Sequence, residues 1–150
     1  MDVNEVVTRA LDTLRRERPG ATDRISFHSS SPVFVSSDPT MMERILVNLL
    51  SNALTHAAPS PITVDVGRGE GWVSLRVIDH GPGVPESERA QFFQPFRRVG
   101  DGNPTSGVGV GLAIARGFAE ALGGELLLDD TPGGGCTLVL TLPPEGPDHS

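Results

Sequence analysis

The residues best suited to chemistry surround Asp79, which ends an apolar stretch and opens a D-H-G-P-G turn. An ionised carboxylate only accepts hydrogen bonds, so it suits a donor such as the exocyclic amino group of adenine. Gly81 and Gly83 allow the backbone to approach a flat ring closely and to take positive φ angles. Since Asp and Gly are also common turn residues, the alternative is an ordinary turn capped by the carboxylate.

A second group consists of Gly107, Gly109 and Gly111, which alternate along the chain just before an apolar helical pattern. Backbone amides at the start of a helix form an anion site that phosphates can occupy. No Gly-Lys-Ser/Thr sequence follows, so this is not a Walker loop, and the spacing differs from a dinucleotide fingerprint. The polar stretch between Asp79 and these glycines suits a flexible cover.

Asn48 and Asn52 form the third group, four residues apart in a strong helical pattern. Their side chains fall on one face of that helix, at the shoulder of its apolar stripe. An amide oxygen is a hard ligand that suits a magnesium ion also bound to phosphates. The alternative is two polar residues on a half-exposed helix. The order of the three groups along the chain nevertheless indicates an ATP site.

Between the turn and the glycines, Phe92, Phe93 and Phe96 are followed by Arg97 and Arg98. Phenylalanines could anchor a lid while a guanidinium reaches phosphate. The alternative is a short helix with core phenylalanines. Among the other reactive residue types, the four histidines show no metal-ligand spacing and the single cysteine has no evident base.

Length and composition indicate one domain with a sizeable core, since the chain has 150 residues. A net charge of −7 argues against a nucleic-acid partner, which would need a basic surface. The single cysteine excludes an internal disulfide framework and is typical of a reducing compartment. The sequence has no apolar run of membrane-spanning length and no signal-peptide pattern at its start.

Hydrophobic periodicity predicts the elements that position these groups. Helices are expected at residues 3–14, 38–57, 86–93 and 112–122. Strands are expected at residues 25–28, 33–35, 62–66, 73–77, 125–129 and 137–142. Asp38 and Pro39 begin the second helix, Gly123 and Gly124 end the last, and residues 67–71 connect a hairpin. The expected fold is α+β, a two-layer α/β sandwich with helices on one face of a mixed, mostly antiparallel sheet.

Taken in order, these segments resemble the catalytic ATP-binding domain of sensor histidine kinases, in the Bergerat-fold (GHKL) group shared with gyrase, Hsp90 and MutL. The matching segments are residues 43–53 for the N box, 79–83 for the G1 box, 92–98 for the F box, 107–112 for the G2 box and 133–143 for the closing glycine turn and strand. The resemblance covers residues 38–143. Residues 107–143 are most similar to potassium-responsive KdpD kinases.

The resemblance implies a role for each matching residue. Asn52 would ligate Mg²⁺, Asn48 would position metal and phosphates, and Arg98 would contact phosphate from the lid; these three form the catalytic set. The residues implied in ATP binding are Asn52, Thr55, Asp79, Gly81, Gly83, Phe93, Arg97, Gly107, Gly109, Gly111 and Leu112. In such kinases the γ-phosphoryl group passes to a histidine on a separate helical domain.

The resemblance also implies a domain plan and partners. Residues 1–20 would be a connector helix that follows a missing dimerisation and phosphoacceptor domain, residues 21–143 the catalytic domain, and residues 144–150 a flexible tail. The partners would be that helical domain and the receiver domain of a response regulator. The segment would be cytoplasmic without touching the membrane, although its parent protein would be membrane-anchored.

Two positions depart from the family pattern. Thr55 stands where the N box usually carries lysine or arginine, so a cation facing the phosphates is missing, and Arg97 or Arg98 could compensate. Val110 replaces the usual leucine of the G2 box, a mild change. Two other functions stay open: an anti-sigma-factor serine kinase of the same fold, and a nucleotide-binding interaction module without chemistry, for which Thr55 is the best argument.

Overall fold

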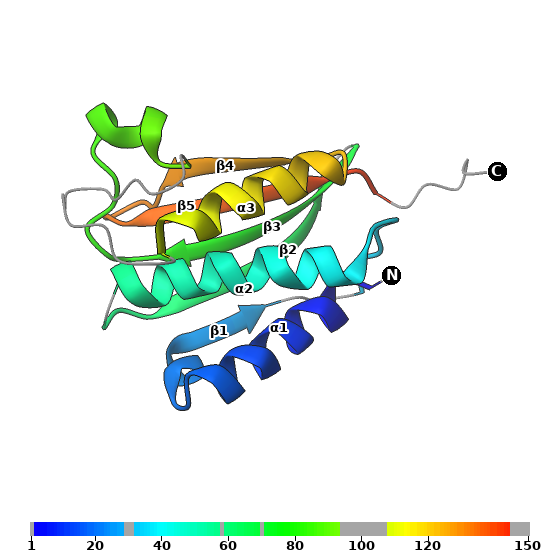
Figure 1. Cartoon of the computed structure of the whole chain (residues 1–150), viewed down its shortest axis with the longest axis horizontal. Helices are drawn as coiled ribbons and strands as arrows, with labels where there is room; N and C mark the ends of the chain where they lie inside the picture. Colours follow the sequence, from blue (N-terminus) through cyan, green and yellow to red (C-terminus); the bar gives the residue numbers. More distant parts are fainter. Residues whose placement is uncertain (1, 29–31, 58, 70, 94–107, 145–150) are drawn as a thin grey trace.

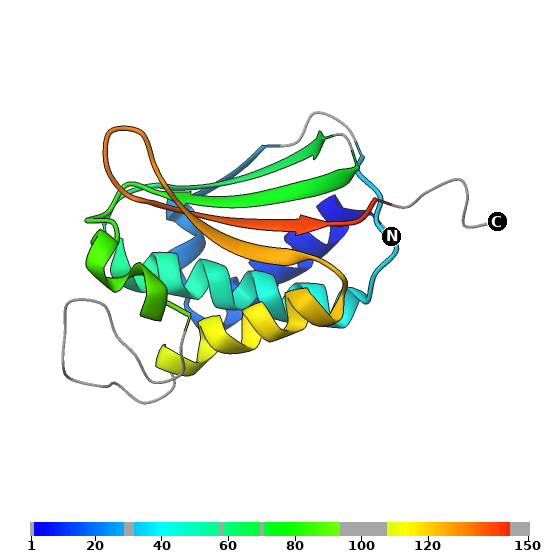
Figure 2. The ribbon, with the colours of Figure 1, turned by 90° about the horizontal axis from the view of Figure 1, so that it is seen from above.

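The computed structural model describes residues 2–28, 32–57, 59–69, 71–93 and 108–144, and the side chains of residues 108–110 lie outside this description. Three helices, α1 (Val3–Glu17), α2 (Pro39–His56) and α3 (Val108–Ala121), cover one face of a sheet (Figures 1 and 2). The strands are β1 (Ile25–His28), β2 (Ile62–Gly69), β3 (Trp72–Asp79), β4 (Glu125–Asp130) and β5 (Cys136–Leu142). The two-layer fold expected from the sequence is therefore confirmed.

The sheet has the strand order β1-β2-β3-β5-β4. β1 runs parallel to β2, and every other neighbouring pair is antiparallel. β2 and β3 form the expected hairpin, with Gly69 paired to Trp72, so the connecting turn is shorter than residues 67–71. This order places the end of β3 beside the start of β5, which brings Asp79 close to the turn between β4 and β5.

The helix starts follow the capping rules that the sequence indicated. The carboxylate of Asp38 accepts hydrogen bonds from the backbone N–H groups of Thr40 and Met41 at 2.9 and 3.2 Å, and Pro39 occupies the first turn of α2. Asp2 caps α1 in the same way, with its carboxylate 3.0 Å from the backbone nitrogen of Asn4. These caps fix where α1 and α2 enter the helical layer.

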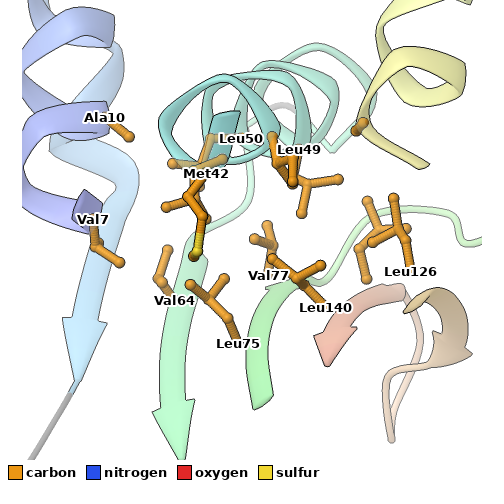
Figure 3. Close-up of a cluster of buried hydrophobic side chains, with 14 of the residues drawn as sticks. Val7, Ala10, Met42, Leu49, Leu50, Val64, Leu75, Val77, Leu126 and Leu140 are labelled. Atoms are coloured by element: carbon orange, nitrogen blue, oxygen red, sulfur yellow. The ribbon is translucent and has the colours of Figure 1, made fainter. Parts of the chain in front are cut away.

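A continuous apolar core fills the space between the two layers (Figure 3). α2 lies at its centre and presents Met42, Leu49 and Leu50 toward the inward residues of the sheet, such as Val64 and Leu75 (Figure 3). Alternate residues of each strand point inward, and so do residues three or four positions apart on each helix. These two sets of side chains meet in the core. The core therefore holds α2 rigidly against the sheet.

α1 contributes to the same core. Its buried residues are Val3, Val6, Val7, Ala10 and Leu14, each no more than 1% exposed. Among the described helices, none combines the length and apolarity needed to cross a bilayer.

Three expected elements differ from the structure. Residues 33–35 are not a strand of the sheet: Phe34 and Val35 form isolated bridges to Asp2 and Pro144, and the carbonyl of Val33 accepts a hydrogen bond from the N–H of Val3 at the start of α1. Residues 86–91 form a 3₁₀ helix, η2 (Glu86–Gln91), instead of an α-helix through Phe93. α3 begins at Val108, four residues earlier than expected, so Gly109 and Gly111 lie in its first turn and not in a loop.

Candidate functional site

α2 and α3 enclose a cavity of about 230 Å³. Its lining residues are Arg18, Asn48, Ser51, Asn52, Thr55, Gly111 and Leu112. Five of these were candidate site residues, and they come from two segments some sixty positions apart in the sequence. Sequence reasoning missed Arg18 and Ser51. A second, more open hollow over α1 contains none of the candidate residues.

Asn48 joins the two helices that form this cavity. Its side-chain Nδ2 donates a 3.0 Å hydrogen bond to the carbonyl oxygen of Gly111 in the first turn of α3. A Cβ atom at Gly111 would lie 3.6 Å from the amide of Asn48, so the two helices approach closely here. Asn48 and Asn52 are both half-buried, as expected for the shoulder of the apolar stripe. Their amides therefore lie along one wall of the cavity.

Asp79 is only 6% exposed at the end of β3, and its carboxylate is held in place by two backbone groups. Oδ1 accepts hydrogen bonds from the N–H groups of Gly81 and Cys136, each at 3.0 Å. The turn-capping alternative thus describes Oδ1 correctly. Oδ2 accepts no hydrogen bond from any residue that the structure describes. One oxygen is therefore structural, and the other remains an acceptor.

The turn after Asp79 is clamped between two neighbouring segments. A Cβ atom at Gly81 would lie 2.9 Å from Ala57, just beyond α2, so a larger residue cannot fit. Gly83 has φ +78°, as expected, and its Cβ position lies 3.3 Å from the carbonyl oxygen of Gly135 in the β4–β5 turn. Gly81 is thus required by close approach and not by a positive φ. These contacts fix the carboxylate relative to α2.

Arg24, in the 3₁₀ helix η1 (Ala21–Arg24), secures the other side of this clamp. Its guanidinium donates to the carbonyl oxygens of Leu54, Ala57 and Ser60 at 3.2, 3.1 and 3.0 Å. Backbone carbonyls in the last turn of a helix have no partner inside the helix, and Arg24 supplies one for Leu54. The carbonyl of Ala57 also accepts hydrogen bonds from the backbone N–H and the hydroxyl of Ser60, so Arg24 joins a turn that is already closed. Sequence reasoning missed Arg24, because the pairing joins segments about thirty residues apart.

Cys136 belongs to the architecture of the turn and not to its chemistry. Burial, together with the nearby carboxylate of Asp79, raises the pKa of its thiol from the ordinary 9.0 to about 12. A thiol of this pKa is protonated at neutral pH and is a poor nucleophile. Its backbone N–H, in contrast, orients Asp79 directly.

Phe93 lies beside α3 at the end of the described part of the expected lid. Its ring packs edge-on against Phe92, with centroids 5.1 Å apart, and the guanidinium of Arg116 lies 5.1 Å from its centroid. Arg89 in η2 forms an ion pair with Asp130 of β4, which ties the same segment to the sheet. Arg97, Arg98 and Gly107 fall outside the described residues.

With this geometry in place, comparison with known proteins identifies the class. Residues 37–146 match the family described as histidine kinase-, DNA gyrase B-, and HSP90-like ATPase. The match covers well over half of the chain, so the chain belongs to this family of ATP-binding domains.

Individual relatives narrow the class further. The sensor protein KdpD of Rathayibacter rathayi is 43% identical over 145 residues, which are 95% of this chain but only 16% of that protein. The solved structure of the mycobacterial sensor histidine kinase MprB is 30% identical, with a TM-score of 0.81 and coverage of 97% of both chains. The ATP-binding domain of PrrB from Mycobacterium tuberculosis has a TM-score of 0.77 at 26% identity and covers 97% of this chain and 96% of that one.

This chain is therefore a histidine kinase ATP-binding domain, and its expected similarity to KdpD is confirmed. It spans about a sixth of the length of its KdpD relatives. The same findings give no support to a serine kinase directed at a sigma factor or to a binding module without chemistry.

Proposed function

We propose that this chain binds MgATP beside the last turns of α2 and, within a longer protein, donates the γ-phosphoryl group to a histidine on a separate helical dimerisation domain. The receiver domain of a response regulator takes the group from that histidine. The observation that carries the proposal is the pairing of an amide-lined cavity with a rigid carboxylate turn, both adjoining the end of α2.

The adenine end of the proposed site is the turn at Asp79, with Gly81 and Gly83 shaping its wall. Because Oδ1 already accepts two backbone N–H groups, Oδ2 is the acceptor for the amino group of adenine. Guanine presents a carbonyl oxygen at the same ring position, and two acceptors facing each other repel. This arrangement supports selection of ATP over GTP.

The phosphate end is the cavity, and its donor set suits a magnesium ion held together with a nucleotide. Asn52 contributes an amide oxygen, and within the described part of the chain no three His, Cys, Asp or Glu side chains gather into a protein-only metal site. Mg²⁺ is typically held by one or two protein oxygens together with phosphates and water. When bound, it neutralises the charge of the phosphates.

The remaining residues position the triphosphate. Asn48 holds the first turn of α3 through Gly111 and orients the phosphates beside Asn52. Thr55 and Leu112 line the same cavity, and Phe93 anchors the lid against α3. Arg97, Arg98 and Gly107 complete the proposed lid, with Arg98 on the γ-phosphate. Gly109, in the first turn of α3, offers a backbone amide to the phosphates. Catalysis in this scheme is mainly positioning and charge neutralisation.

The test is Asn52→Ala, assayed for phosphotransfer to a supplied helical phosphoacceptor domain. We expect the variant to stay folded, because the apolar stripe beside Asn52 is untouched, and to lose magnesium-dependent transfer while its affinity for adenosine stays unchanged. Arg44→Ala on the same helix is the matched control, since Arg44 is exposed and outside the cavity. Transfer at the wild-type rate by folded Asn52→Ala would remove Asn52 from the metal site.

A further inference from the structure

The cavity has a cationic side chain that the family pattern does not provide. Arg18 lines it together with Ser51, Asn52 and Thr55 of α2. Thr55 is the position where lysine or arginine is usual, so the missing cation and Arg18 share one cavity. On the basis of the proposed function, we propose that Arg18 supplies the positive charge for the phosphates of ATP in place of a residue at position 55.

The backbone around Arg18 is hydrogen-bonded on both sides, which fixes the point from which its exposed side chain reaches the cavity. Its N–H donates a 2.7 Å hydrogen bond to the carbonyl of the fully buried Leu14, and its carbonyl accepts one from Ala21 at 3.0 Å. Arg24, a few residues later, is bonded to the end of α2. The segment from residue 14 to residue 24 is therefore attached to the same helix that carries Asn52.

The guanidinium of Arg18 is also free to bind an anion. Its side chain forms no hydrogen bond or ion pair with any residue that the structure describes. The neighbouring arginines already have side-chain partners within α1, since Arg15 is paired with Asp12 and Arg16 donates to Thr13. An unpaired guanidinium next to amide and hydroxyl groups suits a phosphate, which it can bind through two parallel N–H groups.

The experiment compares ATP and adenosine binding by calorimetry in the wild-type chain, Arg18→Ala, Arg18→Lys and the control Arg16→Ala. We expect Arg18→Ala to weaken ATP binding by about fivefold, a typical effect for a partly solvated charge pair. Adenosine affinity should not change, because adenosine lacks phosphates. Arg18→Lys should keep most of the ATP affinity and Arg16→Ala all of it. The loss should shrink as salt is added.

Thr55→Lys provides the complementary measurement. In the Arg18→Ala background, Thr55→Lys should restore ATP affinity. In the wild-type chain it should raise ATP affinity by a smaller factor, because two cations then contact the same phosphates. ATP affinity unchanged in Arg18→Ala overturns the proposal, and so does an equal loss for ATP and adenosine.

Two further outcomes separate this proposal from the general function. Unchanged ATP affinity with reduced phosphotransfer would mean that Arg18 contacts the helical partner domain, which overturns its role toward phosphate and leaves the ATP site standing. A wild-type chain that binds neither ATP nor adenosine would overturn the proposed function and the role of Arg18 together.

Discussion

At the scale of single residues, Asp79 combines two roles that the sequence presented as alternatives. A carboxylate has two oxygens, and the structure uses Oδ1 to close the turn while no described residue occupies Oδ2. The sequence predicted both roles, because Asp followed by Gly-x-Gly fits either. It could not predict that Cys136 would share Oδ1, since that bond joins residues 57 positions apart.

Replacing the carboxylate of Asp79 with an amide separates these roles. Asp79→Asn can keep the acceptor at Oδ1 but can place an NH₂ group opposite the amino group of adenine, so we expect ATP affinity to fall by about tenfold or more. The fold should survive with a modest loss of stability. Calorimetry with ATP and GTP, together with a thermal melt, measures both effects.

The matched control is Asp65→Asn, because Asp65 is exposed on β2. We expect this control to match the wild-type chain in ATP affinity and melting temperature. Equal affinity of the wild-type chain for ATP and GTP would contradict the role proposed for Oδ2.

At the scale of elements, the β4–β5 turn is part of the site although it lies far from Asp79 in sequence. Periodicity predicted the strands and the glycines predicted the turn, yet neither shows which segment the turn contacts. A Cβ atom at Gly135 would lie 2.1 Å from the carbonyl oxygen of Asp79. Close backbone approach of this kind depends on tertiary structure, which is why sequence reasoning assigned Gly135 no role.

Two adjacent glycines allow a controlled test of that contact. Gly134 and Gly135 have similar φ angles of +115° and +121°, but a Cβ atom at Gly134 would meet nothing within 4 Å. Gly134→Ala should therefore cost only backbone strain, about 1–3 kcal/mol. Gly135→Ala should cost clearly more and should also weaken ATP binding. Urea unfolding and ATP titration of both variants measure this, and equal losses would argue against the contact.

At the scale of the whole molecule, the two layers and most of their elements were predictable from periodicity, but the strand order and the attachment of α1 were not. An amphipathic pattern shows that a helix has a buried face without showing what covers it. In the structure that face joins the core beneath α2, so the helical layer and the sheet form one packed body (Figure 3). We therefore expect α1 to be required for the fold of the nucleotide site.

Neighbouring substitutions on α1 test this dependence. Val7 is fully buried and Thr8 is exposed, so Val7→Asp should unfold the domain whereas Thr8→Asp should change its stability by about 0.5 kcal/mol or less. A folded Val7→Asp variant that binds ATP normally would mean that α1 is dispensable.

At pH 8, the reactivity of the Cys136 thiol measures whether an α1 variant has unfolded. Its pKa is about 12 in the folded chain against an ordinary value of 9.0, so it reacts with thiol reagents mainly after unfolding.

The same pKa difference makes the stability of the fold depend on pH. Because the pKa of Cys136 is higher in the folded chain, its contribution to the free energy of unfolding is present below pH 9 and is lost as the pH rises toward 12.

The three bonds from Arg24 have an electrostatic consequence for the ligand. The aligned peptide dipoles of a helix place about half a negative charge at its C-terminal end, and Asn52 and Thr55 in the last turns of α2 line the proposed phosphate site. A polyphosphate there would be repelled by the carbonyls of the last turn. By binding the carbonyls of Leu54 and Ala57, the Arg24 guanidinium neutralises this helix terminus. An arginine outside the cavity thereby makes the end of α2 compatible with an anionic substrate.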